Sequence, residues 1–107
     1  MKYDYNISEY ISKLNVEIPP EEEFKKIAQI FKIYPNESKE NALVNYERGM
    51  LLYGLISKYK PKTILEIGRA QGYSTMCMAW ALCENKIDGK IISVDPVSYE
   101  NPIEWLI

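Results

Sequence analysis

Residues 63–74 read TILEIGRAQGYS, and this stretch decides the fold. A short run of β-branched and aliphatic residues, 63–67, leads into a turn with two glycines. Residues of helical composition follow, so the pattern predicts a buried strand, a tight turn and a helix over residues 73–85. A second turn and a second apolar run, residues 90–94, come next. The sequence therefore predicts one strand–helix–strand unit with two parallel strands and a right-handed crossover.

The residues before this unit show the periodicity of helices. Apolar residues recur there at three- and four-residue spacing, with prolines as punctuation, and we expect helices at about residues 6–14, 20–32 and 39–59. The first is capped by Asn6 or Ser8, and Gly54 in the third predicts a close contact with another helix. We therefore predict an α/β fold: a helical segment over residues 1–60, then the first β-α-β unit of a larger sheet over residues 61–107, together one incomplete domain.

The composition excludes several classes of function. The chain has 107 residues, of which 47% are hydrophobic and 26% charged, which fits one globular domain and excludes a wholly disordered protein. Thirteen Lys+Arg against fifteen Asp+Glu give a net charge of -2, so neither nucleic acid nor membrane is an expected partner. No apolar run approaches the roughly 18–20 residues of a membrane span, and no secretory signal opens the chain. We expect a cytoplasmic protein.

The chain contains no histidine, which is the commonest general base and metal ligand. Catalysis by a Ser-His or Cys-His pair within the chain is therefore excluded, and no metal site is predicted. Cys77 and Cys83 lie six residues apart in a predicted helix, about 240° around its axis, which argues against a disulfide between them. We expect them to be reduced and mostly buried. Met76, Met78 and Trp80 are expected in the core.

The turn between strand and helix has the chemistry of a ligand site. Gly68 and Gly72 allow a sharp turn and a close approach of the backbone to a ligand, and the N–H groups at a helix start favour an anion. Asp95 follows the second strand, where a carboxylate can accept hydrogen bonds from both hydroxyls of a ribose. The turn and the acid together predict a crevice for an adenosine-sized cofactor.

The spacing of the glycines separates two cofactor classes. A dinucleotide fingerprint that begins at Gly68 requires glycines at positions 70 and 73, whereas the chain has Ala70 and Tyr73. A nicotinamide or flavin site therefore fits poorly and is the less favoured alternative.

Residues 61–96 carry a longer set of motifs. The acid Glu66 is followed by Gly68 two residues later and by a second glycine, Gly72, with Tyr73-Ser74 directly after it. Three further groups lie downstream: Met78-Ala79, Gly89-Lys90 and Val94-Asp95-Pro96. This set resembles the class I S-adenosylmethionine-dependent methyltransferases, and within them the small-molecule O-methyltransferases of the catechol and caffeoyl-CoA type. The resemblance implies a Rossmann-like sheet, S-adenosylmethionine as cofactor and methyl transfer to a small-molecule substrate.

The resemblance also implies a role for each site residue. Asp95 would bind the ribose hydroxyls, and the backbone around Gly68 would hold the methionine amino group. Ser74 and the amides at the helix start, after Gly72 and at Tyr73, would take the cofactor carboxylate. Glu66 would order the loop and the polar end of the cofactor, because a carboxylate in an apolar strand needs donors. Ala70 replaces the glycine common at the middle position, a mild departure.

These residues also have purely structural interpretations. Glu66 can be a strand-end acid that pairs with Arg69 or with a lysine. Asp95 can be a turn-former before a proline, and Ser74 can be only a helix cap. The conjunction of an acid, two glycines, Tyr-Ser and a later aspartate in one short unit favours the functional interpretation.

The end of the sequence limits the function that we expect. The chain stops twelve residues after Asp95, so the domain is expected to be truncated, with a two-stranded sheet whose edges are open. We predict the S-adenosylmethionine-binding N-terminal portion of an O-methyltransferase, inactive by itself, with no catalytic residue assigned. The alternative is a non-catalytic assembly module or small subunit with a vestigial cofactor turn. A second copy or a partner chain is expected to cover the open sheet edges.

Overall fold

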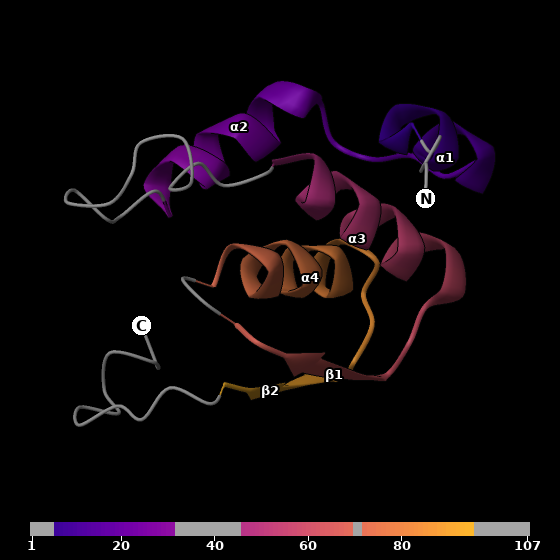
Figure 1. The fold of residues 1–107 in the computed structure, drawn as a ribbon. Coiled ribbons are helices and arrows are strands. Elements are labelled where there is room, and N and C mark those ends of the chain that lie inside the picture. The colour runs from indigo at the N-terminus through magenta and orange to yellow at the C-terminus, as the bar shows by residue number, and fades with distance from the viewer. Residues whose placement is uncertain (1–5, 32–45, 70–71, 96–107) are drawn as a thin grey trace, which may run out of the picture.

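The computed structural model describes residues 6–31, 46–69 and 72–95, and its ribbon is shown in Figure 1. Within these residues the order of elements is α1 (Ile7–Leu14), α2 (Glu21–Ile30), α3 (Tyr46–Tyr59), β1 (Thr63–Ile67), α4 (Tyr73–Glu84) and β2 (Lys90–Val94). The two strands pair in parallel, so the predicted α/β class and the strand–helix–strand unit are confirmed.

The first helix is defined by side-chain chemistry at both ends. Asn6 caps α1, since its Oδ1 accepts hydrogen bonds from the backbone amides of Ser8, at 2.9 Å, and Glu9, at 3.4 Å. Asn15 ends the helix in the left-handed conformation, with φ of 56°. The predicted helix is confirmed, and of the two candidate caps the structure selects Asn6.

The second helix ends earlier than expected, and the third ends at Tyr59 as predicted. Pro20 is the N-cap of α2, and three glutamates fill the first turn, where the helix dipole favours negative charge. The helix ends at Ile30, with Phe31 as its C-cap, so it is shorter than the pattern predicted. The expected start of the third helix near residue 39 lies outside the described residues.

Helix α3 occupies the centre of the helical layer and contacts α1, α2 and α4. Two glycines permit its close contacts. A Cβ on Gly54 would lie 3.0 Å from Leu14 Cδ1, which confirms the predicted contact with another helix. A Cβ on Gly49 would overlap the hydroxyl of Tyr73 and the thiol of Cys77 on α4. Gly49 was not predicted from the sequence as a contact residue, yet this glycine sets the distance between α3 and α4.

One hydrophobic core joins the N-terminal helices to the strand–helix–strand unit. Its centre is an aromatic cluster of Phe24 from α2, Tyr53 from α3 and Trp80 from α4, with ring centroids 5.1–5.8 Å apart. Around the cluster lie buried residues from the same three helices: Ala28, Ile56, Tyr73, Cys77, Met78, Ala81 and Leu82. Helices α2 and α3 therefore pack as one layer over α4, and α1 packs on α3.

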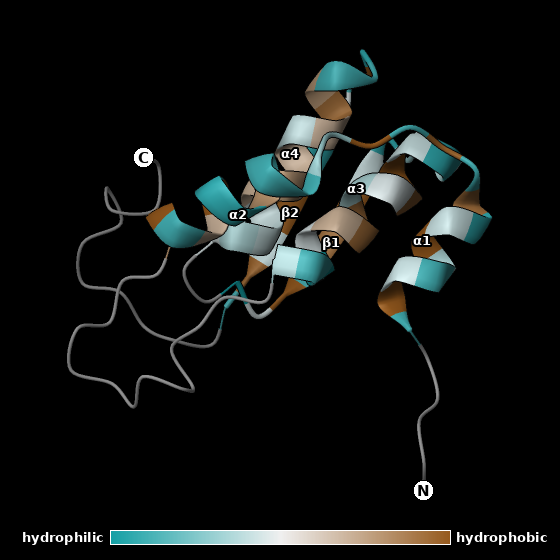
Figure 2. Ribbon diagram, turned by 90° about the horizontal axis from the view of Figure 1, so that it is seen from above, coloured by the Kyte–Doolittle hydropathy of each residue, from teal (hydrophilic) through white to brown (hydrophobic). Residues whose placement is uncertain are grey.

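The sheet is covered on one face. Figure 1 shows α4 and α3 on one side of β1 and β2, and no described element lies on the other side. Ile64 and Ile91 pack against the core, whereas the alternate positions point away. There Leu65 is 63% exposed and Ile67 is 78% exposed, with Ile92 and Val94 on the paired strand also exposed. The predicted burial of the strands therefore holds for the face that the helices cover and not for this one, and Figure 2 shows that both strands are largely hydrophobic.

The cysteines differ in their surroundings. Both are free thiols, but Cys77 is fully buried and Cys83 is exposed, so the expectation of two buried thiols holds for Cys77 alone. Met78 lies in the core as predicted, whereas Met76 on the same helix is exposed. None of the helices in the described ranges is long and apolar enough to cross a membrane.

Candidate functional site

The carboxyl ends of β1 and β2 meet at one edge of the sheet. In the parallel register Ile67 lies opposite Val94, and the backbone amide of Gly68 donates a 2.7 Å hydrogen bond to the carbonyl of Val94. This bond extends the strand pairing by one step into the turn. As a result, Gly68 and Asp95, which follow the two strands, lie at the same end of the unit.

Two glycines shape the turn from β1 into α4. Gly68 has φ of 81° and Gly72 has φ of 100°, both in the region that side chains with a Cβ rarely adopt. A Cβ added at Gly68 would meet no described atom within 4 Å. Lack of space therefore does not explain why residue 68 is a glycine. The positive φ explains it, and the open space beside Gly68 lets a ligand approach the main chain closely.

Asp95 ties the turn to the end of β2. Its Oδ2 accepts a 3.0 Å hydrogen bond from the backbone amide of Arg69, 26 residues earlier in the sequence. The carboxylate is half-buried. This contact orients Asp95 toward the turn, which is where the sequence analysis placed a ribose-binding acid. The alternative interpretation of Asp95, as a turn-former before a proline, depends on residue 96, which lies outside the described residues.

Glu66 is a buried acid inside the strand, 8% exposed. Its Oε1 accepts hydrogen bonds from the hydroxyls of Thr75 on α4 and Ser93 on β2, the latter at 2.9 Å. Among the described residues no ion pair to Glu66 is formed, so neutral donors take the place of the alternative pairing with Arg69 or a lysine. These donors make a buried carboxylate tolerable in the sheet.

Thr75 and Ser93 were not predicted as partners of Glu66 from the sequence. A signal for Ser93 was present, because aligning the two strands end to end places it directly opposite Glu66. Thr75 lies in the first turn of α4, near the end of the strand that carries Glu66. Both hydroxyls fix the acid below the turn.

Tyr73 and Ser74 open α4 in different environments. Tyr73 is 3% exposed, and its hydroxyl donates a 2.7 Å hydrogen bond to the carbonyl of Tyr46 on α3. Burial raises the pKa of Tyr73 well above its ordinary value, so the phenol stays protonated. Its side chain thus joins the core, and its backbone lies at the helix start. Ser74 is half-buried in the first turn.

No side chain caps the start of α4. Gly72 is the N-cap of α4 and offers no side-chain hydrogen bond, so the interpretation of Ser74 as the cap is wrong. The first N–H groups of a helix have no intrahelical acceptor and carry the positive end of the helix dipole. The turn therefore presents hydrogen-bond donors beside the carboxylates of Glu66 and Asp95.

The structure thus brings six of the seven predicted site residues to one end of the unit: Glu66, Gly68, Gly72, Tyr73, Ser74 and Asp95. The seventh, Ala70, lies outside the described residues. The site combines amide donors, which suit an anion, with a half-buried carboxylate, which suits hydroxyl groups. Among the described residues no group of three metal-ligating side chains is present.

Comparison with protein families agrees with this geometry. The family model described as O-methyltransferase matches residues 17–103 of the 107-residue chain, a span that covers the turn, α4 and both strands. The chain belongs to the O-methyltransferase family, whose members depend on S-adenosylmethionine. No curated protein and no solved structure matches the chain.

Proposed function

We propose that the turn between β1 and α4 binds S-adenosylmethionine and that the chain serves methyl transfer to a hydroxyl group of a small molecule. One observation carries the proposal: the hydrogen bond from the Arg69 amide to Asp95 places a carboxylate beside a glycine turn at the carboxyl end of parallel strands. This is the position in which open α/β sheets bind nucleotides. Family membership supports the choice of cofactor.

Each part of the cofactor has a candidate partner in the site. Asp95 would accept hydrogen bonds from the ribose hydroxyls, and the backbone at Gly68 would receive the methionine amino group. Ser74 and the first amides of α4 would bind the carboxylate, which the helix dipole favours. Glu66, held by its two hydroxyl donors, would keep the floor of the turn in place. The half-buried position of Asp95 strengthens such hydrogen bonds by excluding water.

In methyl transfer the main task of the protein is to position the cofactor and the acceptor. The sulfonium of the bound cofactor makes its methyl group electrophilic. Holding the acceptor oxygen in line with that methyl group would supply much of the rate enhancement by orientation. With no histidine among these 107 residues, a base for the acceptor hydroxyl would come from another residue type, from the substrate or from further polypeptide.

The open sheet face supports a second part of the proposal. Leu65 and Ile67 expose more than half of their side chains, and an exposed apolar sheet with open edges is prone to association. We infer that in the working enzyme further polypeptide covers this face, and that the chain by itself is inactive. The same feature favours the second candidate function, an assembly module whose turn binds nothing. Free thiols on α4 suit a reducing, cytoplasmic location.

Calorimetric titration of the chain with S-adenosylhomocysteine tests the cofactor proposal. The informative variant is Asp95→Asn, because it keeps an oxygen for the Arg69 amide and removes the charge. We expect saturable binding by the parent chain and about tenfold weaker binding by the variant, since hydrogen bonds to charged groups contribute roughly 1.5–3 kcal/mol.

The matched control is Asp88→Asn, an exposed acid in the turn between α4 and β2. It should bind like the parent chain. A folded chain that ignores S-adenosylhomocysteine contradicts the cofactor proposal and favours the assembly module. Preferential binding of NAD would favour the dinucleotide alternative.

A further inference from the structure

An aromatic ring from α2 lies against the glycine turn of the proposed cofactor site. Phe31, the C-cap of α2, places its Cε1 atom 3.7 Å from the position that a Cβ on Gly72 would occupy. Gly72 is the N-cap of α4 and has φ of 100°, so it belongs to the turn itself. Figure 1 shows the end of α2 and the start of α4 at the same side of the molecule. The N-terminal helices therefore reach the site, which otherwise comes from the strand–helix–strand unit.

Phe31 is held in this place by the core. Its side chain packs against the core cluster, and its backbone amide donates a 3.2 Å hydrogen bond to the carbonyl of Ile27. It follows the fully buried Phe24 by seven residues, which is two turns along the same face of α2. Unlike Phe24, it is partly exposed. Phe31 is therefore a fixed aromatic wall beside the turn, with part of the residue accessible to a ligand.

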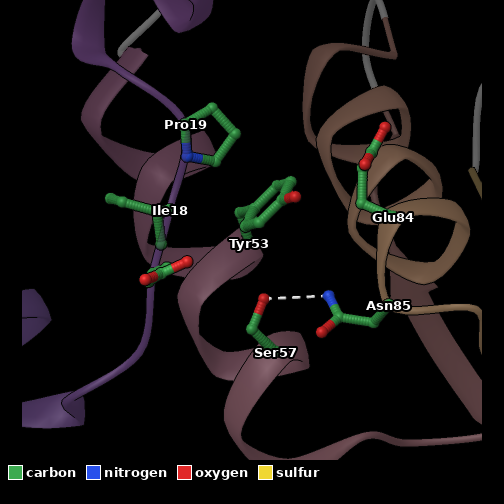
Figure 3. A pocket seen from close by; sticks show the side chains of 7 residues that line it. Ile18, Pro19, Tyr53, Ser57, Glu84 and Asn85 are labelled. Atoms are coloured by element: carbon green, nitrogen blue, oxygen red, sulfur yellow. Dashed lines mark hydrogen bonds between the residues drawn. The ribbon is translucent and has the colours of Figure 1, made fainter.

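Two other aromatic side chains near the ends of α4 are committed to the core. At the far end, a pocket of about 360 Å³ is lined by Tyr53, whose ring Figure 3 shows between α4 and the segment that precedes α2. Tyr53 is 5% exposed, and its ring packs edge to face against Phe24 and Trp80. At the start of α4, Tyr73 is 3% exposed. Of these rings, Phe31 is the one that a ligand in the glycine turn can contact.

The proposed cofactor has a cationic group close to the part that this turn would hold. Its carboxylate is assigned to the first amides of α4, directly after Gly72. The methionyl chain separates that carboxylate from the sulfonium by three carbon atoms. A ring in contact with Gly72 is therefore a candidate neighbour of the sulfonium. The face of an aromatic ring attracts such a cation, and the attraction grows where water is excluded.

We propose that Phe31 is a cofactor-binding residue whose ring contacts the sulfonium and its methyl group. The ring makes the site prefer S-adenosylmethionine over S-adenosylhomocysteine, whose sulfur is uncharged. Such a preference favours the release of the spent cofactor after methyl transfer. The inference rests on the proposed function and deepens it, because it gives α2 a part in selecting between the two forms of the cofactor.

Calorimetric titration of the chain with each of the two ligands measures this preference. Phe31→Leu keeps an apolar side chain and removes the ring. We expect it to weaken the binding of S-adenosylmethionine about two- to fivefold more than the binding of S-adenosylhomocysteine. Phe31→Tyr retains the ring and should retain the preference. The matched control is Tyr59→Leu, which removes a ring that is 65% exposed at the end of α3 and should bind both ligands like the parent chain.

An NMR measurement on the parent chain makes the outcome independent of how the variants fold. The chain has two phenylalanines, and Phe24 is fully buried, so phenylalanine-labelled protein offers a ligand one accessible ring. We expect an NOE from the S-methyl protons of bound S-adenosylmethionine to the ring of Phe31 and none to Phe24.

Two results would overturn the inference and leave the cofactor proposal intact, provided that Asp95→Asn still weakens saturable binding. The first is the absence of an NOE to Phe31, and the second is an equal loss of affinity for both ligands in Phe31→Leu. A folded parent chain that binds neither ligand would overturn the cofactor proposal and this inference together.

Discussion

Ser93 lies directly opposite Glu66 in the β1–β2 register, and its hydroxyl donates a 2.9 Å hydrogen bond to Glu66 Oε1. The hydroxyl of Thr75 reaches the same oxygen from α4. One buried carboxylate thus links both strands and the helix that connects them. Because the link lies directly beneath the glycine turn, it connects the stability of the unit to the shape of the proposed cofactor site.

We expect Ser93→Ala and Thr75→Val each to lower the free energy of unfolding by about 1–2 kcal/mol, because each removes a donor from a buried carboxylate. Urea unfolding measures this loss. Thr63→Val, at an exposed position of β1, is the matched control and should change stability by less than about 0.5 kcal/mol. Parent-like stability in both site variants would show that Glu66 does not need these donors.

Gly49→Ala tests the contact between α3 and α4. The added Cβ would overlap the Tyr73 hydroxyl and the Cys77 thiol, so we expect a loss of about 1–3 kcal/mol despite the better helix propensity of alanine. Gly54→Ala gains the same propensity but meets only the tip of Leu14, so its loss should be smaller. Thermal unfolding compares the two. A Gly49→Ala chain as stable as the Gly54→Ala chain would contradict the close packing at residue 49.

The two thiols should react at very different rates. Cys83 is exposed and Cys77 is fully buried, and burial raises the pKa of the Cys77 thiol to about 11. Since the thiolate is the reactive form, we expect one fast and one slow phase with a chromogenic disulfide at pH 8. Cys83→Ser should remove the fast phase alone. Two fast phases in the folded chain would mean that α4 does not pack as described.

Alkaline conditions should destabilise the chain. Burial raises the pKa of Cys77 from 9.0 to about 11, so the folded state holds this proton more tightly than the unfolded state does. Its contribution to stability is complete below pH 9 and is lost as the pH rises to 11, which amounts to at most roughly 3 kcal/mol. Urea unfolding at pH 8 and pH 10.5 measures the difference.

Cys77→Ala should reduce this dependence on pH, and Cys83→Ser, at the exposed thiol, should leave it intact. A residual slope is expected in Cys77→Ala, because burial also raises the pKa of Tyr73 and of Tyr53. Equal slopes in the Cys77→Ala variant and the parent chain would exclude Cys77 as a source of the alkaline instability.

The elements with strong local signals could be predicted from the sequence. Residues 63–67 and 90–94 form strands as expected, because β-branched runs bounded by turn residues are locally unambiguous. The positions of Gly68 and Asp95 followed from strand order, since residues after parallel strands share one edge. The hydrogen bond between Asp95 and the amide of Arg69 could not be predicted, because it depends on the exact path of the turn.

Features that depend on tertiary packing were predicted less well. The burial of the Tyr73 side chain requires the narrow separation that Gly49 allows, and a single helix pattern does not reveal it. The exposure of Cys83, six residues after the buried Cys77, follows from which side of α4 faces α3. Likewise, an apolar strand pattern indicates two hydrophobic faces but does not show which of them the described helices cover.

The aromatic cluster of Phe24, Tyr53 and Trp80 gives the molecule an internal spectroscopic reporter. Trp80 belongs to the strand–helix–strand unit, whereas the two rings it contacts come from the helices that precede that unit. Undocking of those helices would place the indole in water and shift its emission to longer wavelength, and a Trp105→Phe substitution would remove the emission of the second tryptophan. The coupling of the two halves of the chain can therefore be followed optically, without any label.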